Sequence, residues 1–169
     1  MPLFTTYEFN SLEDLLLNQL EDLYDAENRL VKALPRMADA ATAPALRRAF
    51  ESHLEETKHQ VERLNTIFQQ LGRTPERETC EAMKGLLREG EEMIDAKGNP
   101  DVKDAALIAA AQRVEHYEMA GYGTARTFAS RLGYSEAARL LQSTLDEEMA
   151  ADKKLTQVAE SEVNVTATR

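Results

Sequence analysis

The fold of this chain is decided by residues 104–132, which read DAALIAAAQRVEHYEMAGYGTARTFASRL. Apolar side chains recur in this stretch at alternating steps of three and four residues, the period of a helix with one face in a bundle core. Two members of that series, Glu115 and Glu118, are acidic. The pattern therefore predicts a long helix that carries two carboxylates in the middle of its buried face.

Two further stretches show the same interruption. Residues 12–41 repeat leucines at core spacing, and the missing member of that series is Glu27. Residues 135–163 leave two such gaps, which are filled by Glu148 and Asp152. A single acid in a core series is weak evidence, because most helical Glu side chains are solvated. Acidic gaps at similar depth in several helices instead predict a shared cluster of carboxylates inside the bundle.

Residues 44–71 predict another helix, whose apolar face is less regular. At 100° per residue His53 lies within the apolar stripe, and Glu56 lies about a quarter-turn to one side. The string Glu56-Thr-Lys-His59 matches the Glu-x-x-His spacing of di-iron bundles, but His59 points further away from the core. We therefore favour His53 and Glu56 as site residues and keep His59 as the weaker alternative for the imidazole.

The helix-breaking residues divide the chain into long helices. Only five Pro and seven Gly occur in 169 residues, which favours long elements and disfavours a β-sandwich or barrel. The expected helix boundaries are a capping box at Ser11 and Asp14, a start at Pro44, ends at Gly72 and Gly133, and a cap at Ser135.

The order of these helices favours one architecture. Short links join the first long helix to the second and the third to the fourth, whereas about 28 residues with their own short helix separate the two pairs, enough to cross the length of a bundle. We predict an all-α fold, a ferritin-like four-helix bundle with a short extra helix in the long middle crossover. An up-down-up-down bundle with an inserted helix stays open. The expected divisions are an N-terminal extension over 1–10, the bundle over 11–162 and a frayed C-terminal tail over 163–169.

Composition excludes several classes of function. The net charge of −10 disfavours nonspecific nucleic-acid binding, which needs a basic face. No run of 18 apolar residues predicts a membrane span, and the first residues lack the pattern of a signal peptide. Cys80, the single cysteine, has no partner for an internal disulfide, which fits a reducing compartment. We expect a cytoplasmic protein without nucleic-acid or membrane partners.

Clustered buried carboxylates need cations, because unpaired buried charges are costly. The apolar series of the helices supply no Lys or Arg. Oxygen ligands with one imidazole suit iron or manganese better than structural zinc, which more often takes thiolates. The cofactor that we expect is two metal ions, iron or else manganese. The expected ligands are Glu27, His53, Glu56, Glu115, Glu118, Glu148 and Asp152.

Five segments carry a family resemblance, namely residues 20–27, 50–57, 104–118, 120–124 and 145–155. With them the chain resembles the YciE/YciF-like family of bacterial proteins, within the ferritin-like superfamily, from about residue 10 to 160. The resemblance implies a dinuclear centre akin to that of rubrerythrin, a homodimer and a link to stress responses. It places Glu27, Glu56, Glu115, Glu118 and Glu148 at the positions of bridging and terminal carboxylates.

One departure from the superfamily pattern concerns the last long helix. The superfamily offers Glu-x-x-His there, whereas Glu148 is followed by Asp152 one turn on, which we expect to replace the imidazole. Tyr122, one turn after Glu118, either donates a hydrogen bond into the metal cavity or is an ordinary core residue.

Two functional hypotheses follow. The first is a di-metal protein that reacts with oxygen or peroxide, and it needs an external electron donor because one cysteine cannot build a rubredoxin-type module. The second is a non-enzymatic dimeric stress or interaction protein with a structural or vestigial metal site. A metal-free bundle with hydrated acids is a weaker third. Whether any reaction is catalysed stays open at this point.

Overall fold

The computed structural model describes residues 7–75 and 78–168. These residues form helices and connecting turns, without a strand among them, so the predicted all-α class is confirmed. The helices are α1 (Leu12–Ala40), α2 (Pro44–Gln70), α3 (Glu81–Asp95), α4 (Pro100–Arg131), α5 (Ser135–Val158), the π-helix η1 (Ala159–Val163) and α6 (Asn164–Ala167).

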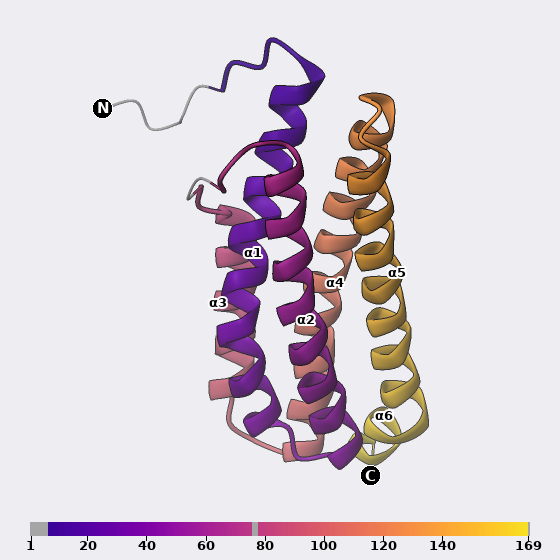
Figure 1. Ribbon diagram of the computed structural model, residues 1–169. Coiled ribbons are helices and arrows are strands. Elements are labelled where there is room, and N and C mark those ends of the chain that lie inside the picture. Colours follow the sequence, from indigo (N-terminus) through magenta and orange to yellow (C-terminus); the bar gives the residue numbers. More distant parts are fainter. Residues whose placement is uncertain (1–6, 76–77, 169) are drawn as a thin grey trace, which may run out of the picture.

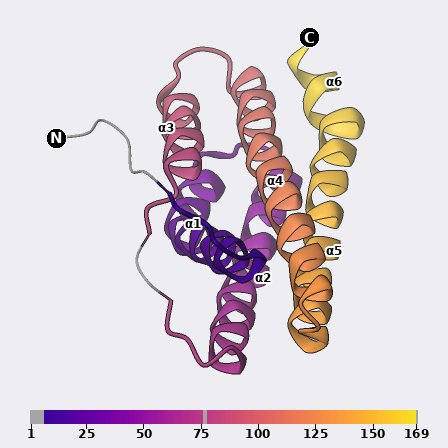
Figure 2. The same cartoon turned by 90° about the horizontal axis from the view of Figure 1, so that it is seen from above.

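The topology is that of a bundle with one crossover. Helix α1 packs on α2 and α4, and α5 packs on α4 and α2. Figure 1 shows α1 and α5 running downward and α2 and α4 running upward, so that each of these neighbours is antiparallel. Helix α3 carries the chain back along the outside of the bundle and packs on α4 and α1, as the view along the bundle in Figure 2 shows. The crossover topology is therefore the correct one of the two alternatives.

Most helix ends follow from local sequence. Ser11 and Asp14 form the predicted capping box, with Asp14 N–H donating to Ser11 Oγ at 3.0 Å and Ser11 N–H donating to Asp14 Oδ2 at 2.9 Å. Gly72 and Gly133 follow α2 and α4 with φ of 65° and 82°, a conformation that glycine adopts without strain. The predicted cap at Ser135 is wrong, because α5 begins at Ser135 and its N-cap, Tyr134, makes no side-chain cap bond.

The start of α2 is held from another helix. Its N-cap, Ala43, has no capping side chain. Instead Asp104 of α4, which is buried, accepts the backbone N–H groups of Thr42 at 2.9 Å and Ala43 at 2.6 Å. Two donors that a helix start leaves unpaired are thus satisfied by one carboxylate, which fixes the α1–α2 turn against α4.

The C-terminal segment stays helical beyond residue 162, where the sequence analysis ended the bundle. Helix α5 continues as η1 and then α6, to Ala167. Val163 is buried and belongs to the core. An apolar contact of this kind stabilises the last turns, which a Thr-rich composition does not reveal.

The core has two apolar halves with polar residues between them. One half surrounds Leu34, Phe50 and Leu107, and the other surrounds Leu20, Phe68 and Leu141. Buried acidic and amide side chains of α1, α2, α4 and α5 lie in the middle of the bundle. Among the described residues, no helix combines the length and apolar character that crossing a membrane requires.

Candidate metal centre

Four buried side chains converge in the middle of the bundle. They come from three helices, His53 from α2, Glu115 and Glu118 from α4, and Glu148 from α5. Each offers one ligand atom, and these four atoms all lie within 4.8 Å of one another. Four facing ligand atoms at this separation can enclose a metal ion. The cluster exists because the core spacing of α4 and α5 turns these positions inward, as the sequence predicted.

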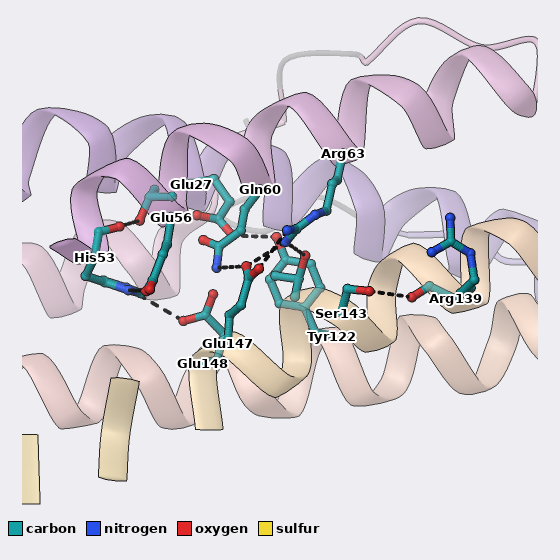
Figure 3. A network of polar contacts seen from close by, with 12 residues as sticks. Glu27, His53, Glu56, Gln60, Arg63, Tyr122, Arg139, Ser143, Glu147 and Glu148 are labelled. Atoms are coloured by element: carbon teal, nitrogen blue, oxygen red, sulfur yellow. Dashed lines mark hydrogen bonds and ion pairs between the residues drawn. The ribbon is translucent and has the colours of Figure 1, made fainter. Parts of the chain in front are cut away.

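His53 faces carboxylates on both sides of its ring. Its Nε2 lies 3.4 Å from Glu115 Oε1 and 3.7 Å from Glu148 Oε2, and its Nδ1 lies 3.3 Å from Glu56 Oε2. Figure 3 shows His53 pointing toward Glu148, with Glu56 beside the ring. This arrangement lets Nδ1–H donate to Glu56 while the lone pair of Nε2 faces the cluster. A carboxylate commonly fixes the tautomer and the orientation of a metal-binding histidine in this way.

Glu27 extends the cluster along the bundle from α1. It is fully buried, and its Oε1 accepts a short hydrogen bond from Tyr122 Oη. Tyr122 is buried in the apolar half around Leu20, Phe68 and Leu141, so it is a core residue that also donates a hydrogen bond to Glu27. Glu27 lies outside the group of four, but the charge of His53 acts on its carboxyl group.

The buried carboxylates lack the donors that burial normally requires. Within the described residues, six of their oxygen atoms have no hydrogen-bond partner, namely Glu27 Oε2, Glu115 Oε2, and both oxygens of Glu118 and of Glu148. His53 Nε2 is likewise without a hydrogen bond. A native core pairs nearly all its buried polar atoms, and bound cations could satisfy such a concentration of unpaired acceptors.

The electrostatics of the cation-free cluster point the same way. Burial raises the pKa of Glu27 to about 8 and that of Glu148 to about 7. Burial also raises the pKa of Glu115 and Glu118 well above the ordinary value, with neighbouring carboxylates adding to the effect. Burial opposes the charged form of His53, but the surrounding carboxylates outweigh it and raise its pKa to about 10. Each of these raised pKa values favours the protonated form of the group in the cation-free cluster.

Other expected site residues lie at the edge of the cluster. Glu56 has a side chain 43% exposed and contacts His53 without belonging to the group of four itself. Asp152, 22% exposed, accepts a hydrogen bond from Gln112 Nε2 at 3.0 Å and lies 3.4 Å from His116 Nε2. His59 is exposed, so of the two alternatives for the imidazole the structure brings His53 into the cluster.

Three functional candidates were missed by the sequence reading. Gln60 is buried beside the cluster, and its Nε2 donates to Glu147 Oε2 at 3.2 Å. Arg63 donates hydrogen bonds to both oxygens of Glu147, at 2.5 and 2.6 Å. Gln60 follows His53 by seven residues, a spacing that places it on the same buried helix face but does not mark a neutral amide as a ligand. Arg63 and Glu147 lie outside the core series and left no signal.

Two cavities reach the cluster. One, of about 370 Å³, lies between α2 and α5 and is lined by His53, Glu56 and Glu115 together with Arg48 and Lys154. Arg48 and Lys154 are exposed, so this cavity connects the His53 end of the cluster with solvent. The other, of about 40 Å³, is almost wholly apolar and reaches Glu115 from between α1, α3 and α4. The His53 end is therefore the accessible end of the cluster.

Comparison with known proteins places the chain in a family. Residues 11–168 match the family model described as "Domain of unknown function (DUF892)". The curated protein YciF of Escherichia coli K12 is 46% identical over 155 residues, which cover 91% of this chain and 93% of YciF.

Solved structures agree. The crystal structure of the Escherichia coli stress protein YciF matches with a TM-score of 0.89, covering 92% of this chain and 99% of that one at 46% identity. YcfI of Rhodopseudomonas palustris matches with a TM-score of 0.87 at 44% identity, covering 92% of this chain and 99% of its own. A Xanthomonas campestris protein, 21% identical with a TM-score of 0.73, covers 94% of this chain and 98% of its own and shares the fold. The chain therefore belongs to the DUF892 family and is a YciF-like protein, as the sequence resemblance predicted.

Proposed function

We propose that this protein is a dinuclear metal carboxylate protein, with iron or manganese as the metal. The observation that carries the proposal is the convergence of His53, Glu115, Glu118 and Glu148, whose ligand atoms lie within 4.8 Å of one another. Five of the six carboxylate oxygens of this group lack a hydrogen-bond partner in the described chain. One imidazole with several carboxylates is a donor set that suits iron and manganese.

The charge of the cluster supports two ions rather than one. Glu27, Glu115, Glu118 and Glu148 carry four negative charges when ionised, and His53 is the one basic group among the buried residues of the cluster. Two divalent ions would supply four positive charges and leave the imidazole neutral, which is the form that binds metal. The cluster is also elongated along the helix axes, from His53 toward Tyr122 in Figure 3.

Each side chain has a role that follows from its place. His53 and Glu115 would hold the ion at the accessible end, and Glu56 orients His53 through Nδ1. Glu118 and Glu148, whose oxygens all lack hydrogen-bond donors among the described residues, would bind metal in the middle of the cluster. Glu27 would hold the second ion, while Tyr122 fixes its Oε1 atom. Asp152, expected as a ligand, holds Gln112 and lies near His116 instead.

The chemistry of such a pair of metals, when bound, is the activation of oxygen or peroxide. The chain itself admits small polar molecules through the 370 Å³ cavity and keeps the far end of the site dry with its apolar core. Its one cysteine, Cys80, is buried as the N-cap of α3, so reducing equivalents come from another protein. YciF is described as a stress protein, and the proposal includes a stress role for this chain as well. It also includes a homodimer and a cytoplasmic location.

An iron titration tests the proposal. Chelated protein receives Fe(II) without oxygen, and bound iron is measured after desalting; air or peroxide is then added, and its consumption is followed together with the visible spectrum. We expect about two Fe(II) per chain and oxidant consumption by loaded protein only. Protein that binds no iron or manganese would contradict the metal site itself.

A second candidate is a structural metal site in a non-enzymatic protein. The observation that favours it is the single cysteine of the chain, which cannot form a cysteine pair to supply electrons. Bound metal would then stabilise the bundle by linkage without turnover. Metal-dependent stabilisation with no oxidant consumption in the same titration identifies this candidate.

A further inference from the structure

The buried Gln60 has an amide whose orientation is fixed by its neighbours. Its Nε2 donates to Glu147 Oε2 at 3.2 Å, and a carboxylate can only accept. The NH₂ group of Gln60 must therefore face Glu147, which leaves the carbonyl oxygen on the other side of the amide. That Oε1 atom is buried and has no hydrogen-bond partner within the described residues.

Glu147 is itself held rigidly. Arg63 donates to both of its oxygens, at 2.5 and 2.6 Å, and also to Thr144 Oγ1 at 3.2 Å. Partial burial raises the pKa of Glu147, but the hydrogen bonds and charge of Arg63 outweigh it, so the net pKa is lowered and the carboxylate stays ionised. The chain Arg63–Glu147–Gln60 thus sets the direction of the Gln60 carbonyl, as Figure 3 shows.

The register of the helices places Gln60 at the Glu27 end of the cluster. Helices α2 and α4 run in the same direction, and His53 of α2 contacts Glu115 of α4. Gln60 and Tyr122 each lie seven residues further along, about 10 Å at 1.5 Å per residue. Since Tyr122 donates to Glu27, Gln60 and Glu27 share one level of the bundle.

That level lacks an imidazole. His53 serves the opposite end, and the remaining histidines, His59 and His116, are exposed. The atoms that could bind a metal at the Glu27 end are Glu27 Oε2 and the oxygens of Glu118 and Glu148. All of them lack hydrogen-bond partners in the described chain. A neutral carbonyl oxygen adds a ligand there without adding a fifth negative charge to the buried cluster.

We propose that Gln60 Oε1 is a ligand of the second metal ion, in the position that an imidazole holds at the other end, and that Arg63 and Glu147 are its positioning residues. This inference rests on the proposed dinuclear site. It makes the two ion positions unequal, one with a nitrogen ligand from His53 and one with oxygen ligands alone. Hard cations such as Mn(II) suit the all-oxygen position.

The test is an anaerobic Mn(II) titration of chelated protein, in which electron paramagnetic resonance measures the free ion. We expect wild type to bind two Mn(II) per chain. Gln60→Leu, which keeps the bulk and loses the carbonyl, should bind the first ion with unchanged affinity and the second about 10- to 100-fold more weakly. Gln60→His, which restores a ligand atom, should bind two ions. Gln69→Leu, at an exposed position of the same helix, is the matched control.

The outcomes separate this inference from the proposed function. Two Mn(II) bound equally well by wild type and Gln60→Leu would overturn the role of Gln60 and leave the dinuclear site standing, whereas no Mn(II) bound by wild type would overturn both. Equal weakening of both ions with a lower unfolding temperature of the chelated variant would show a merely structural role. If Gln60→Leu does not fold, Gln60→Asn withdraws the carbonyl by one methylene, and the same selective loss of the second ion is required.

Discussion

A Glu118→Gln substitution separates the free-energy penalty of burying a carboxyl group from the contribution of that group to metal binding. Glu118 is fully buried beside other acidic side chains, and neither of its oxygens has a hydrogen-bond donor in the described chain. Burial, and then the charges of Glu27 and Glu148, raise its pKa well above 4.5. The folded metal-free chain therefore holds a proton that the unfolded chain releases above pH 4.5, and its stability falls as the pH rises above that value.

The size of this penalty has an upper bound. Keeping a carboxyl protonated costs about 1.36 kcal/mol for each pH unit above its unfolded pKa. From 4.5 to 7 that is 2.5 units, so the penalty at pH 7 is at most about 3.4 kcal/mol. Gln has nearly the same shape and no charge. Metal-free Glu118→Gln should thus be more stable than wild type at pH 7 by up to about 3 kcal/mol, or about 6–12 °C in Tm.

Metal binding acts in the opposite direction and narrows this difference. An ion at 100 times its Kd stabilises the folded wild type by about 2.7 kcal/mol, which raises Tm by about 5–11 °C. Glu118→Gln loses a bridging charge and should show a much smaller rise. The assay is thermal unfolding at pH 5 and 7, with chelator and with Mn(II). Glu92→Gln, an exposed acid on α3, is the control and should follow wild type.

Two results would refute this reasoning. A chelated Glu118→Gln variant that is less stable than wild type at pH 7 would mean that Glu118 is held by favourable contacts rather than at a penalty. A variant that keeps the full metal-induced rise would mean that Glu118 does not bind the ions.

Three further predictions concern other parts of the molecule. His53→Ala should lower bound metal measured after desalting, whereas His59→Ala should match wild type, since His53 alone of the two faces the cluster; equal retention by both variants would contradict this. Asp104→Ala should destabilise the protein by about 2 kcal/mol, seen as a Tm lower by about 4–8 °C, because two backbone N–H groups at the start of α2 lose their acceptor; an unchanged Tm would refute that role. The chelated protein should lose stability in denaturant titrations between pH 5 and 8, because folding raises the pKa of Glu27 to about 8 and of Glu148 to about 7, so the folded chain holds more protons; stability that rises with pH would contradict this sign.

Much of the fold could be predicted because the helix signals are local. The capping box at Ser11 and the glycines after α2 and α4 are each specified by a few adjacent residues. The choice between the two bundle topologies depended on how α3 packs, which no local signal reveals. The helical end of the chain was missed for the same reason, since it depends on the burial of Val163 against the core.

The site divides along a similar line. Glu27, Glu115, Glu118 and Glu148 interrupt regular core series, so helical periodicity alone turns them inward. Positions at the edge of a face are not determined in this way, because the neighbouring helix decides where a long side chain points. Glu56 accordingly turns to the His53 ring.

Amides and paired charges lie beyond what periodicity detects. Asp152 turns to Gln112, and the anchoring of Gln60 by Glu147 and Arg63 joins two helices far apart in the sequence. A glutamine on a buried face has no charge to mark it as a ligand, so its role becomes visible only through the partners that fix its amide.

The most direct test of the account is an anomalous difference map from crystals of this protein grown with Mn(II). The account predicts two peaks inside the bundle that share Glu118 and Glu148, one beside His53 and Glu115 and the other beside Glu27. Crystals of metal-loaded protein with no peak among these residues, or with Mn(II) only on surface carboxylates, would contradict it.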